Sequence, residues 1–141
     1  MISVTVNKRS REVLLDISDL ANKQKSNIRN ALHDIGEEVK RENKRLIKEG
    51  PKTGRIYRYN GKNHQASAPG EPPANRSGRL MKSSNYRVRN HQEMNIGEEA
   101  IHAVFLENGT RKMKPRPHLI RAINNKAGVT YKILEEAGKI S

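Results

Sequence analysis

The sequence contains no cysteine and no tryptophan, and its aromatic residues are four tyrosines and one phenylalanine. The absence of cysteine excludes disulfides and cysteine-ligated zinc sites. Hydrophobic residues make up 33% of the chain, or about 40% when glycine is added, against a usual share of roughly 45–50%. A chain of 141 residues is long enough for one domain. We therefore predict a single domain over residues 1–141 with a thin core.

Long hydrophobic runs are also missing. The first residues, MISVTVNKRSREVLLDISDL, lack the unbroken apolar stretch of a secretory signal or a membrane-spanning helix. We therefore expect no membrane partner. The cysteine-free composition fits a protein made in a reducing cytoplasm.

Acidic residues are scarce in the middle of the chain, where residues 50–92 contain only Glu71. The whole chain has 28 Lys and Arg against 15 Asp and Glu, a formal charge of +13. A field of this sign attracts polyanions, which makes nucleic acid the first partner to consider. The alternative is a charged surface that serves solubility alone, and the composition leaves both open.

Helical periodicity dominates residues 10–49. Apolar residues recur there at spacings of three, four or near multiples of these, and Gly50 and Pro51 follow as stop signals. The polar patch NKQKSN at 22–27 interrupts the apolar stripe, so the pattern leaves open whether this segment is one helix or two. A continuous helix would be roughly 60 Å long. Because this exceeds the width of a small domain, we expect its far end to pack against another subunit.

Strand patterns are short. Residues 2–6 alternate apolar and polar side chains, which is typical of a half-buried strand. In GRIYRYNGKNH, the pair Asn60-Gly61 predicts a β-hairpin with Tyr57 and Tyr59 on one face. A Pro-rich return follows, and together they predict a protruding arm over about residues 51–76. A flexible linker is the alternative for the Pro-rich part.

Short elements and a final helix complete the chain. Ser77 is a candidate N-cap for a short helix, and YRVRN and EMNIGEEAIHAVFLENGT have strand patterns, with a helical turn over 99–107 as the alternative. The last helix is predicted over 117–137, with an apolar face formed by Leu119, Ile120, Ile123, Ala127, Tyr131 and Leu134. The predicted class is α+β: a long N-terminal helix and a C-terminal helix packed on a small antiparallel sheet, with an extended Pro/Gly-rich loop or hairpin arm.

No pattern typical of an enzyme occurs in the sequence. The five histidines show no metal-ligand spacing, and no phosphate-binding loop or nucleophile motif occurs. Three acid pairs consist of adjacent residues, whose side chains diverge and are expected to face solvent: Glu37-Glu38, Glu98-Glu99 and Glu135-Glu136. We therefore predict no catalytic activity, no cofactor and no metal.

The arm combines Tyr57 and Tyr59 with basic side chains, which are suited to contacting phosphates and stacking on bases. The alternative is a hairpin whose tyrosines pack on a neighbour and whose basic residues face water. The candidates for facing DNA are Arg55, Arg58, Lys62, Arg76, Arg79 and Lys82.

Two stretches carry a family likeness: GRIYRYNGKNHQASAPGEPPANRSGRL at 54–80 and HAVFLENGTRKMKPRPHL at 102–119. In this order, and followed by a terminal helix, they resemble the bacteriophage tail-component family that includes putative head-tail joining and tail-completion proteins of long-tailed phages. One departure is His102, where the family pattern has Tyr. The matching positions are Gly54, Arg55 and Tyr57; residues 66–74; Ser77, Gly78 and Leu80; and Leu106, Glu107, Gly109, Thr110, Met113, Arg116 and Pro117.

The resemblance implies a structural protein of the phage neck, located in the virion and assembled in the host cytoplasm, that completes the tail and joins it to the head. It implies a homo-oligomeric ring, with a hexamer favoured, around the axis along which DNA leaves. The implied partners are the head-tail connector, tail-terminator or tail-tube proteins, and packaged DNA contacted without sequence specificity. The alternative function is a sequence-independent nucleic-acid-binding protein.

The resemblance also implies which residues contact other subunits or neck partners. Glu107 is in addition a candidate to pair with Arg116 or with an arginine of a neighbouring subunit. The expected contact residues are Tyr57, Tyr59, Pro69, Gly70, Glu71, Pro72, Pro73, Glu107 and Arg116.

Overall fold

One long helix organises the fold. The computed structural model describes residues 8–139, and the side chains of residues 18–139, and in it helix α1 (Lys8–Glu49) runs without a break. Its 42 residues extend about 63 Å at 1.5 Å per residue, so the polar patch at 22–27 does not divide it. The helix ends at Glu49, and the N–H of the next residue, Gly50, donates to the carbonyl of Leu46 at 2.9 Å. The strand predicted at 2–6 lies outside the described residues.

The other elements are short. Strands β1 (Ile56–Tyr59) and β2 (Lys62–Gln65) form the arm, and helix α2 (Arg79–Ser83) leads into β3 (Ser84–Val88), which pairs antiparallel with β4 (Met94–Glu98). Helices α3 (Ala103–Asn108), α4 (Leu119–Asn125) and α5 (Ala127–Gly138) follow. The predicted α+β class is confirmed, because α1 packs with the C-terminal helix α5 and with small two-stranded antiparallel sheets.

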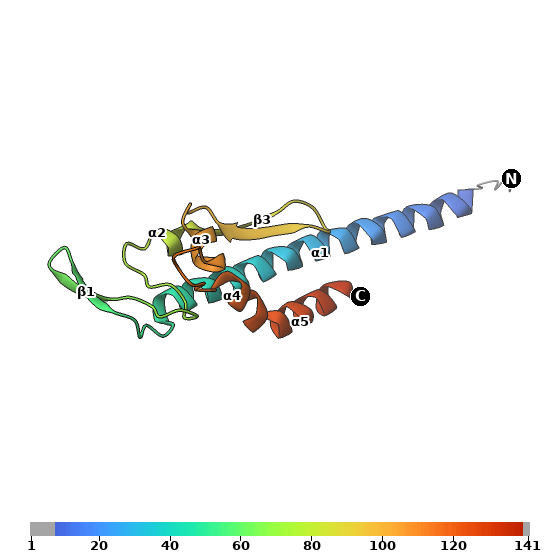
Figure 1. Ribbon diagram of the computed structural model, residues 1–141. Coiled ribbons are helices and arrows are strands. Elements are labelled where there is room, and N and C mark those ends of the chain that lie inside the picture. Colours follow the sequence, from blue (N-terminus) through green and yellow to red (C-terminus); the bar gives the residue numbers. More distant parts are fainter. Residues whose placement is uncertain (1–7, 140–141) are drawn as a thin grey trace.

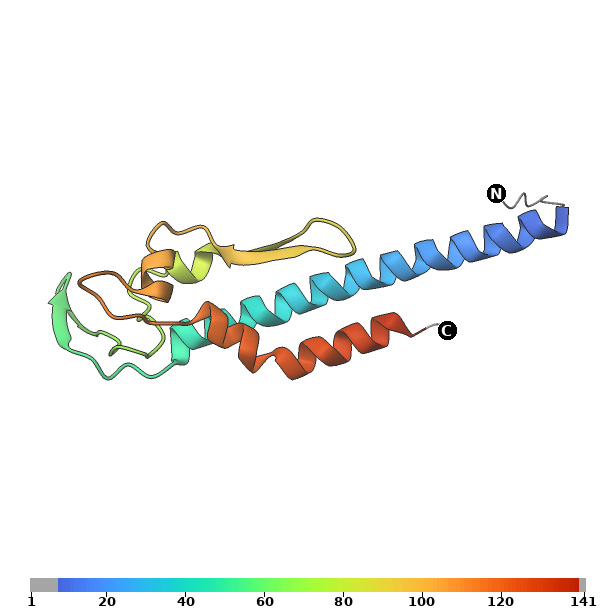
Figure 2. The same ribbon diagram turned by 45° about the vertical axis from the view of Figure 1, so that its right-hand side comes forward.

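Two layers flank the C-terminal half of α1 (Figure 1, Figure 2). The β3–β4 hairpin lies on one side, and α4 and α5 lie on the other. The Gln24 side chain donates to the carbonyl of Gly138 at 3.1 Å, near the end of α5. Beyond this point the N-terminal part of α1 projects past both layers, while the arm projects from the opposite end of the molecule.

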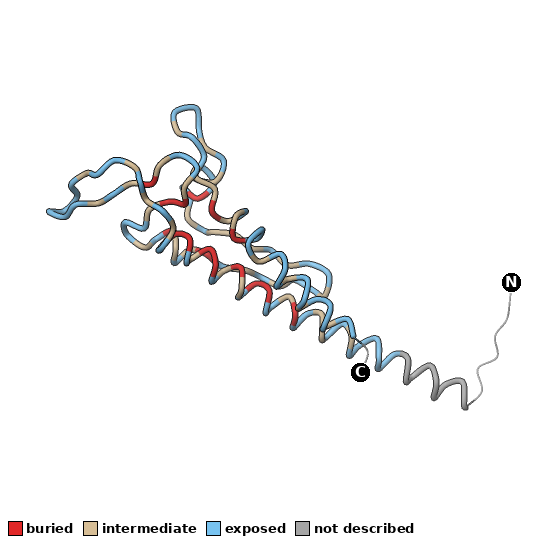
Figure 3. Tube along the Cα trace, turned by 90° about the horizontal axis from the view of Figure 1, so that it is seen from below, coloured by how far each residue is buried: buried red, intermediate tan, exposed pale blue. Residues whose placement is uncertain are grey.

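The core is a stripe along one face of α1 (Figure 3). Ile35, Val39 and Leu46 are buried there against Ala122 of α4. A second cluster joins Ile47 to residues of α2 and α3: Leu80 and Ala103. Both clusters are small, as the low hydrophobic share of the sequence predicts.

A glycine allows β3 to lie directly on α1. Gly36 is buried, and a Cβ atom at this position would overlap the ring of Tyr86. The absence of a side chain therefore makes room for an aromatic ring, and this contact positions the β3–β4 hairpin against the helix.

Several details of the predicted elements differ in the structure. The strands form two separate hairpins rather than one sheet. Residues 103–108 are helical, so the alternative of a helical turn is the one observed. The N-cap of α2 is Gly78, with φ +74°, and Ser77 lies one residue earlier. Lys126 separates the last helix into α4 and α5.

The apolar face predicted for the last helix is largely exposed. Instead, Ala122 is buried and Ile133 packs against the core. The small Ala122 side chain lets α4 approach α1 closely, which places the larger residues of the predicted face outside. The exposed fractions reach 79% for Tyr131 and 51% for Ile120, and Ile123 and Leu134 are also exposed.

Candidate partner-binding site at the base of the arm

The arm is a β-hairpin closed by a two-residue turn. Ile56 pairs with Gln65 and Tyr59 pairs with Lys62, which leaves Asn60 and Gly61 at the tip. Both tip residues have positive φ, 49° and 75°, and this conformation matches the right-handed twist of the strands. The predicted Asn-Gly hairpin is therefore confirmed.

Aromatic side chains cover one face of the arm. The ring centroids of Tyr57 and Tyr59 each lie 6.0 Å from that of His64, the first stacked and the second edge-on. The guanidinium of Arg76 lies 4.4 Å from the Tyr59 centroid, within the range of a cation–π interaction. Arg76 thus ties the end of the return segment to the arm.

Glu71 holds the return loop, residues 66–74, in shape. Its carboxylate accepts hydrogen bonds from the N–H of Thr53 at 2.9 Å, from the Thr53 hydroxyl at 2.5 Å and from the N–H of Ala68 at 2.8 Å. The Thr53 hydroxyl, followed by the two N–H groups, lowers the pKa of Glu71. Glu71, the only acidic residue within residues 50–92, therefore forms hydrogen bonds within its own chain.

The return loop is docked on the body of the same chain. The N–H of Gly70 donates to the carbonyl of Pro115 at 3.0 Å, and Arg121 donates to the carbonyl of Gly70 at 2.7 Å. Arg116 donates to the carbonyl of Ser67 at 3.2 Å. The flexible-linker alternative is wrong, since Ser67, Pro72 and Pro73 are all buried.

Glu107 caps helix α4. Its carboxylate accepts hydrogen bonds from three successive N–H groups, those of His118, Leu119 and Ile120, at 3.0 to 3.1 Å. Burial opposes ionisation of Glu107, but these three donors outweigh it and lower its pKa. The predicted pair of Glu107 with Arg116 is not formed among the described residues, because Arg116 turns toward Ser67.

A buried polar network underlies the site. Nε2 of His118 lies 2.7 Å from Oε2 of Glu98, and Asn43 donates to Oε1 of Glu98 at 2.7 Å and to the Ser84 hydroxyl at 3.1 Å. His118 and Asn43 are fully buried, and the Glu98 side chain is 3% exposed. The prediction that the Glu98-Glu99 pair faces solvent is wrong for Glu98, because its partners on α1 and before α4 enclose it.

These loops line an open cavity of about 510 Å³ at the base of the arm. Its apolar side chains include Leu80, Leu106 and Met113, and its basic side chains are Arg76, Arg79 and Arg116. All of the lining residues lie within residues 54–80 and 102–119. The lining residues are Tyr57, Ala66, Ser67, Pro73, Ala74, Asn75, Arg76, Ser77, Gly78, Arg79, Leu80, His102, Leu106, Met113 and Arg116.

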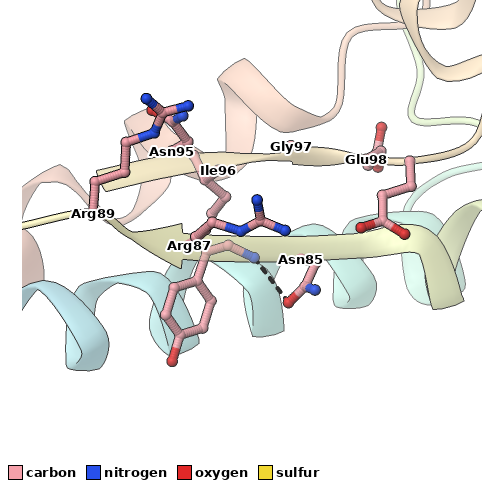
Figure 4. A pocket seen from close by; sticks show the side chains of 9 residues that line it. Asn85, Arg87, Arg89, Asn95, Ile96, Gly97 and Glu98 are labelled. Carbon is pink, nitrogen blue, oxygen red and sulfur yellow. Dashed lines mark hydrogen bonds between the residues drawn. The ribbon is translucent and has the colours of Figure 1, made fainter. Parts of the chain in front are cut away.

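A second depression, of about 250 Å³, lies on the β3–β4 hairpin (Figure 4). Arg87 and Arg89 lie toward one end of this depression and Glu98 toward the other. Between them, Oδ1 of Asn85 accepts a hydrogen bond from the N–H of Tyr86 at 2.9 Å. Because this depression is smaller and its lining mixes both charges, the cavity at the base of the arm is the stronger candidate.

The structure brings together only part of the predicted site. Tyr57, Pro73, Arg76, Arg79 and Arg116 line the cavity, whereas Pro72 is buried outside its lining. Pro69 and Gly70 are exposed on the return loop. The predicted DNA-facing residues are all exposed, but they are distributed over the arm, the segment after it and α2: Arg55, Arg58, Lys62, Arg76, Arg79 and Lys82.

Three residues of the buried polar network were missed from the sequence: Asn43, Glu98 and His118. Asn43 interrupts the apolar face of α1, which is the signal that could have marked it. His118 directly follows the Arg116-Pro117 pair of the resemblance. For Glu98, nothing local distinguishes it from its exposed neighbour Glu99.

Comparisons of the chain with protein-family models, curated proteins and solved structures found no match. Within residues 8–139, no group of three or more acidic or histidine side chains is arranged to hold a metal ion. In the same part of the chain, no helix combines the length and the apolar character needed to cross a membrane.

Proposed function

We propose that this chain is a structural protein of a bacteriophage neck, which completes the tail and joins it to the head as a ring around the DNA exit axis. One observation carries the proposal. The two stretches that resemble the tail-component family, separated in sequence, lie together in one ordered unit at the base of the arm. Hydrogen bonds from Gly70 to Pro115 and from Arg116 to Ser67 join them. These contacts support the proposal, because the two stretches on which it rests form one tertiary unit.

Exposed apolar side chains support contact with other subunits. Ile101 is 88% exposed, and Val104 and Phe105 of α3 are about half exposed. Tyr131 and Leu134 of α5 are exposed as well. Contiguous apolar surface on a small protein commonly marks an interaction site, and closed rings are a common way to bury it.

The shape and charge agree with a place in a ring that surrounds DNA. The N-terminal part of α1 and the arm project in opposite directions (Figure 2), so both are available to neighbours. A formal charge of +13 permits contact with phosphates without reading of sequence.

The experiment that tests the proposal removes the arm while keeping its base. The N–H of Ala66 donates to the carbonyl of Arg55 at 3.0 Å, so Ile56–Gln65 can be replaced by Asn-Gly without opening the loop. We expect the shortened chain to fold and the phage that encodes it to accumulate unjoined heads and tails. Normal yields of infectious particles would contradict the proposed role of the arm.

The alternative is a nucleic-acid-binding protein that does not read sequence. It is favoured by the exposed cations Arg55, Arg58 and Lys62 beside the aromatic face of the arm. It predicts tight binding to free duplex DNA, with an affinity that falls steeply with salt. Absence of binding at low salt would exclude it.

A further inference from the structure

The cavity at the base of the arm has a fixed frame. Glu71 bonds to both Thr53 and Ala68, and Arg116 bonds to Ser67, so the return loop is held on two sides. The opposite wall contains Leu80 of α2, which is 7% exposed and belongs to the core. The site is therefore formed before any partner arrives, which lowers the entropic cost of binding.

The lining combines an apolar part with unpaired positive charge. Leu106 packs against the core cluster of Leu80, and Met113 completes this apolar side. Three guanidinium groups, those of Arg76, Arg79 and Arg116, also line the cavity. No salt bridge among the described residues uses any of the three, in contrast to Arg45, which pairs with Glu42 at 2.7 Å.

No acidic side chain is present among the described residues that line the cavity. Arginine groups without a carboxylate partner are suited to bind one, and such charge-assisted hydrogen bonds are among the stronger ones in proteins. A carboxylate that pairs with them would therefore come from outside the cavity lining.

We infer that the cavity binds an extended segment of a partner protein that carries a carboxylate next to an apolar side chain. The carboxylate contacts Arg76 and Arg79, and the apolar side chain lies on Leu106 and Met113. A volume of about 510 Å³ falls within the range of about 300–1,000 Å³ found for ligand pockets. The inference deepens the proposed function and rests on it for the source of the segment, another protein of the particle.

A protein segment fits the cavity better than DNA does. A sugar-phosphate backbone offers no apolar group to cover Leu106 and Met113. The cations best placed to contact a duplex are instead Arg58 and Lys62, which are exposed on the projecting arm. A protein segment and a DNA duplex would therefore contact different cations, so mutating one set or the other distinguishes the two kinds of binding.

The test is a selection of random short peptides, displayed on yeast, against the purified full chain. We expect the selected peptides to be enriched in Asp or Glu beside Leu, Ile, Met or Phe. Synthetic copies should lose about tenfold or more in affinity for a chain carrying both Arg76→Glu and Arg79→Glu, since tenfold corresponds to about one charge-assisted contact. The matched control is Arg87→Glu with Arg89→Glu on β3 and the turn after it, which should bind as the unmodified chain does.

Three results would overturn the inference: no enrichment of acidic residues, equal binding by both double variants, or displacement of the peptides by duplex DNA through Arg58 and Lys62. If the first double variant does not fold by circular dichroism, Arg79→Gln is the milder substitute. The proposed function can fail separately, because peptide binding is measured on the isolated chain and does not depend on a place in the virion.

Discussion

Nε2 of His118 lies 2.7 Å from Oε2 of Glu98, and both side chains are almost completely buried. Nδ1 of the same ring faces the carbonyl of Arg116 at 3.0 Å and a carboxylate oxygen of Glu107, also at 3.0 Å. A carbonyl can only accept, so Nδ1 carries a proton. Nε2 faces the Glu98 carboxylate, so a doubly protonated ring would donate on both sides and join β4 to the start of α4.

Stability should therefore fall as pH rises above about 6.5, the pKa of histidine in the unfolded chain. Burial opposes the charge on His118, but the hydrogen bond and charge of Glu98 outweigh it and raise the pKa of His118. A raised pKa in the folded state adds stability that is complete below the unfolded value of about 6.5 and is lost as pH rises through the folded value. We expect a slope of at most about 1.4 kcal/mol per pH unit in that window.

Urea unfolding between mildly acidic and mildly alkaline pH measures this slope. His118→Gln should lack the slope, whatever its overall stability. An unchanged slope in the variant would show that another group is responsible.

Glu71→Gln should loosen the return loop and leave the body intact. The amide can neither carry charge nor accept as strongly from Thr53 and Ala68, which now donate to the carboxylate. Hydrogen exchange of the Thr53 and Ala68 amides should become faster, while Glu99→Gln, at an exposed position, serves as the control. Equal exchange rates in both variants would contradict the role of Glu71.

Acid should have the same effect as this substitution. Because the hydroxyl of Thr53 and the backbone donors lower the pKa of Glu71, its contribution is present above the unfolded value of about 4.3 and is lost as pH falls through the lower folded value. The protection of the Ala68 amide, which is its exchange rate relative to the intrinsic rate at each pH, should therefore fall only in that acidic range. Loss of protection near neutral pH would contradict this account.

Gly36→Ala and Gly128→Ala should have opposite effects on stability. A Cβ at Gly36 would overlap the Tyr86 ring, whereas at Gly128 no atom lies nearby. We expect Gly36→Ala to reduce the free energy of unfolding by about 1–3 kcal/mol through overpacking. Gly128→Ala should raise it by about 0.5–1 kcal/mol, because glycine is unfavourable within a helix. Urea titration of the two variants checks both, and a neutral Gly36→Ala would mean that β3 can move off α1.

The exposed face of α5 should mediate self-association. Tyr131→Glu with Leu134→Glu places two charges on side chains that are 79% and 40% exposed, so folding should be unaffected. Light scattering should show the unmodified chain growing in mass with concentration and the variant remaining monomeric. Lys132→Glu is the control, and an unmodified chain that stays monomeric throughout would contradict the prediction.

Elements with strong local signals were predictable from the sequence. The long helix follows from its periodicity and its Gly50-Pro51 stop, and the hairpin follows from Asn60-Gly61. The division of the last helix at Lys126 has no comparable signal, because apolar residues lie on several of its sides. Which side packs depends on the small Ala122 meeting α1, and this contact joins residues far apart in sequence.

The candidate site was predictable only in part, because it too depends on contacts between residues far apart in sequence. The resemblance marked Tyr57 and Arg116, and these do share the cavity. Glu98 and His118 were not distinguished, since their burial depends on one another and on Asn43 of α1. Glu71 and Glu107 were expected to contact partners, but both carboxylates bond to backbone groups of their own chain.

The most direct test of the proposed neck function is cryo-electron microscopy of purified particles from the phage that encodes this chain. Our proposal predicts a ring of copies at the junction of head and tail, with the arm of Ile56–Gln65 in contact with a neighbouring protein. Absence of the chain from the particles, or its presence only away from that junction, would contradict it.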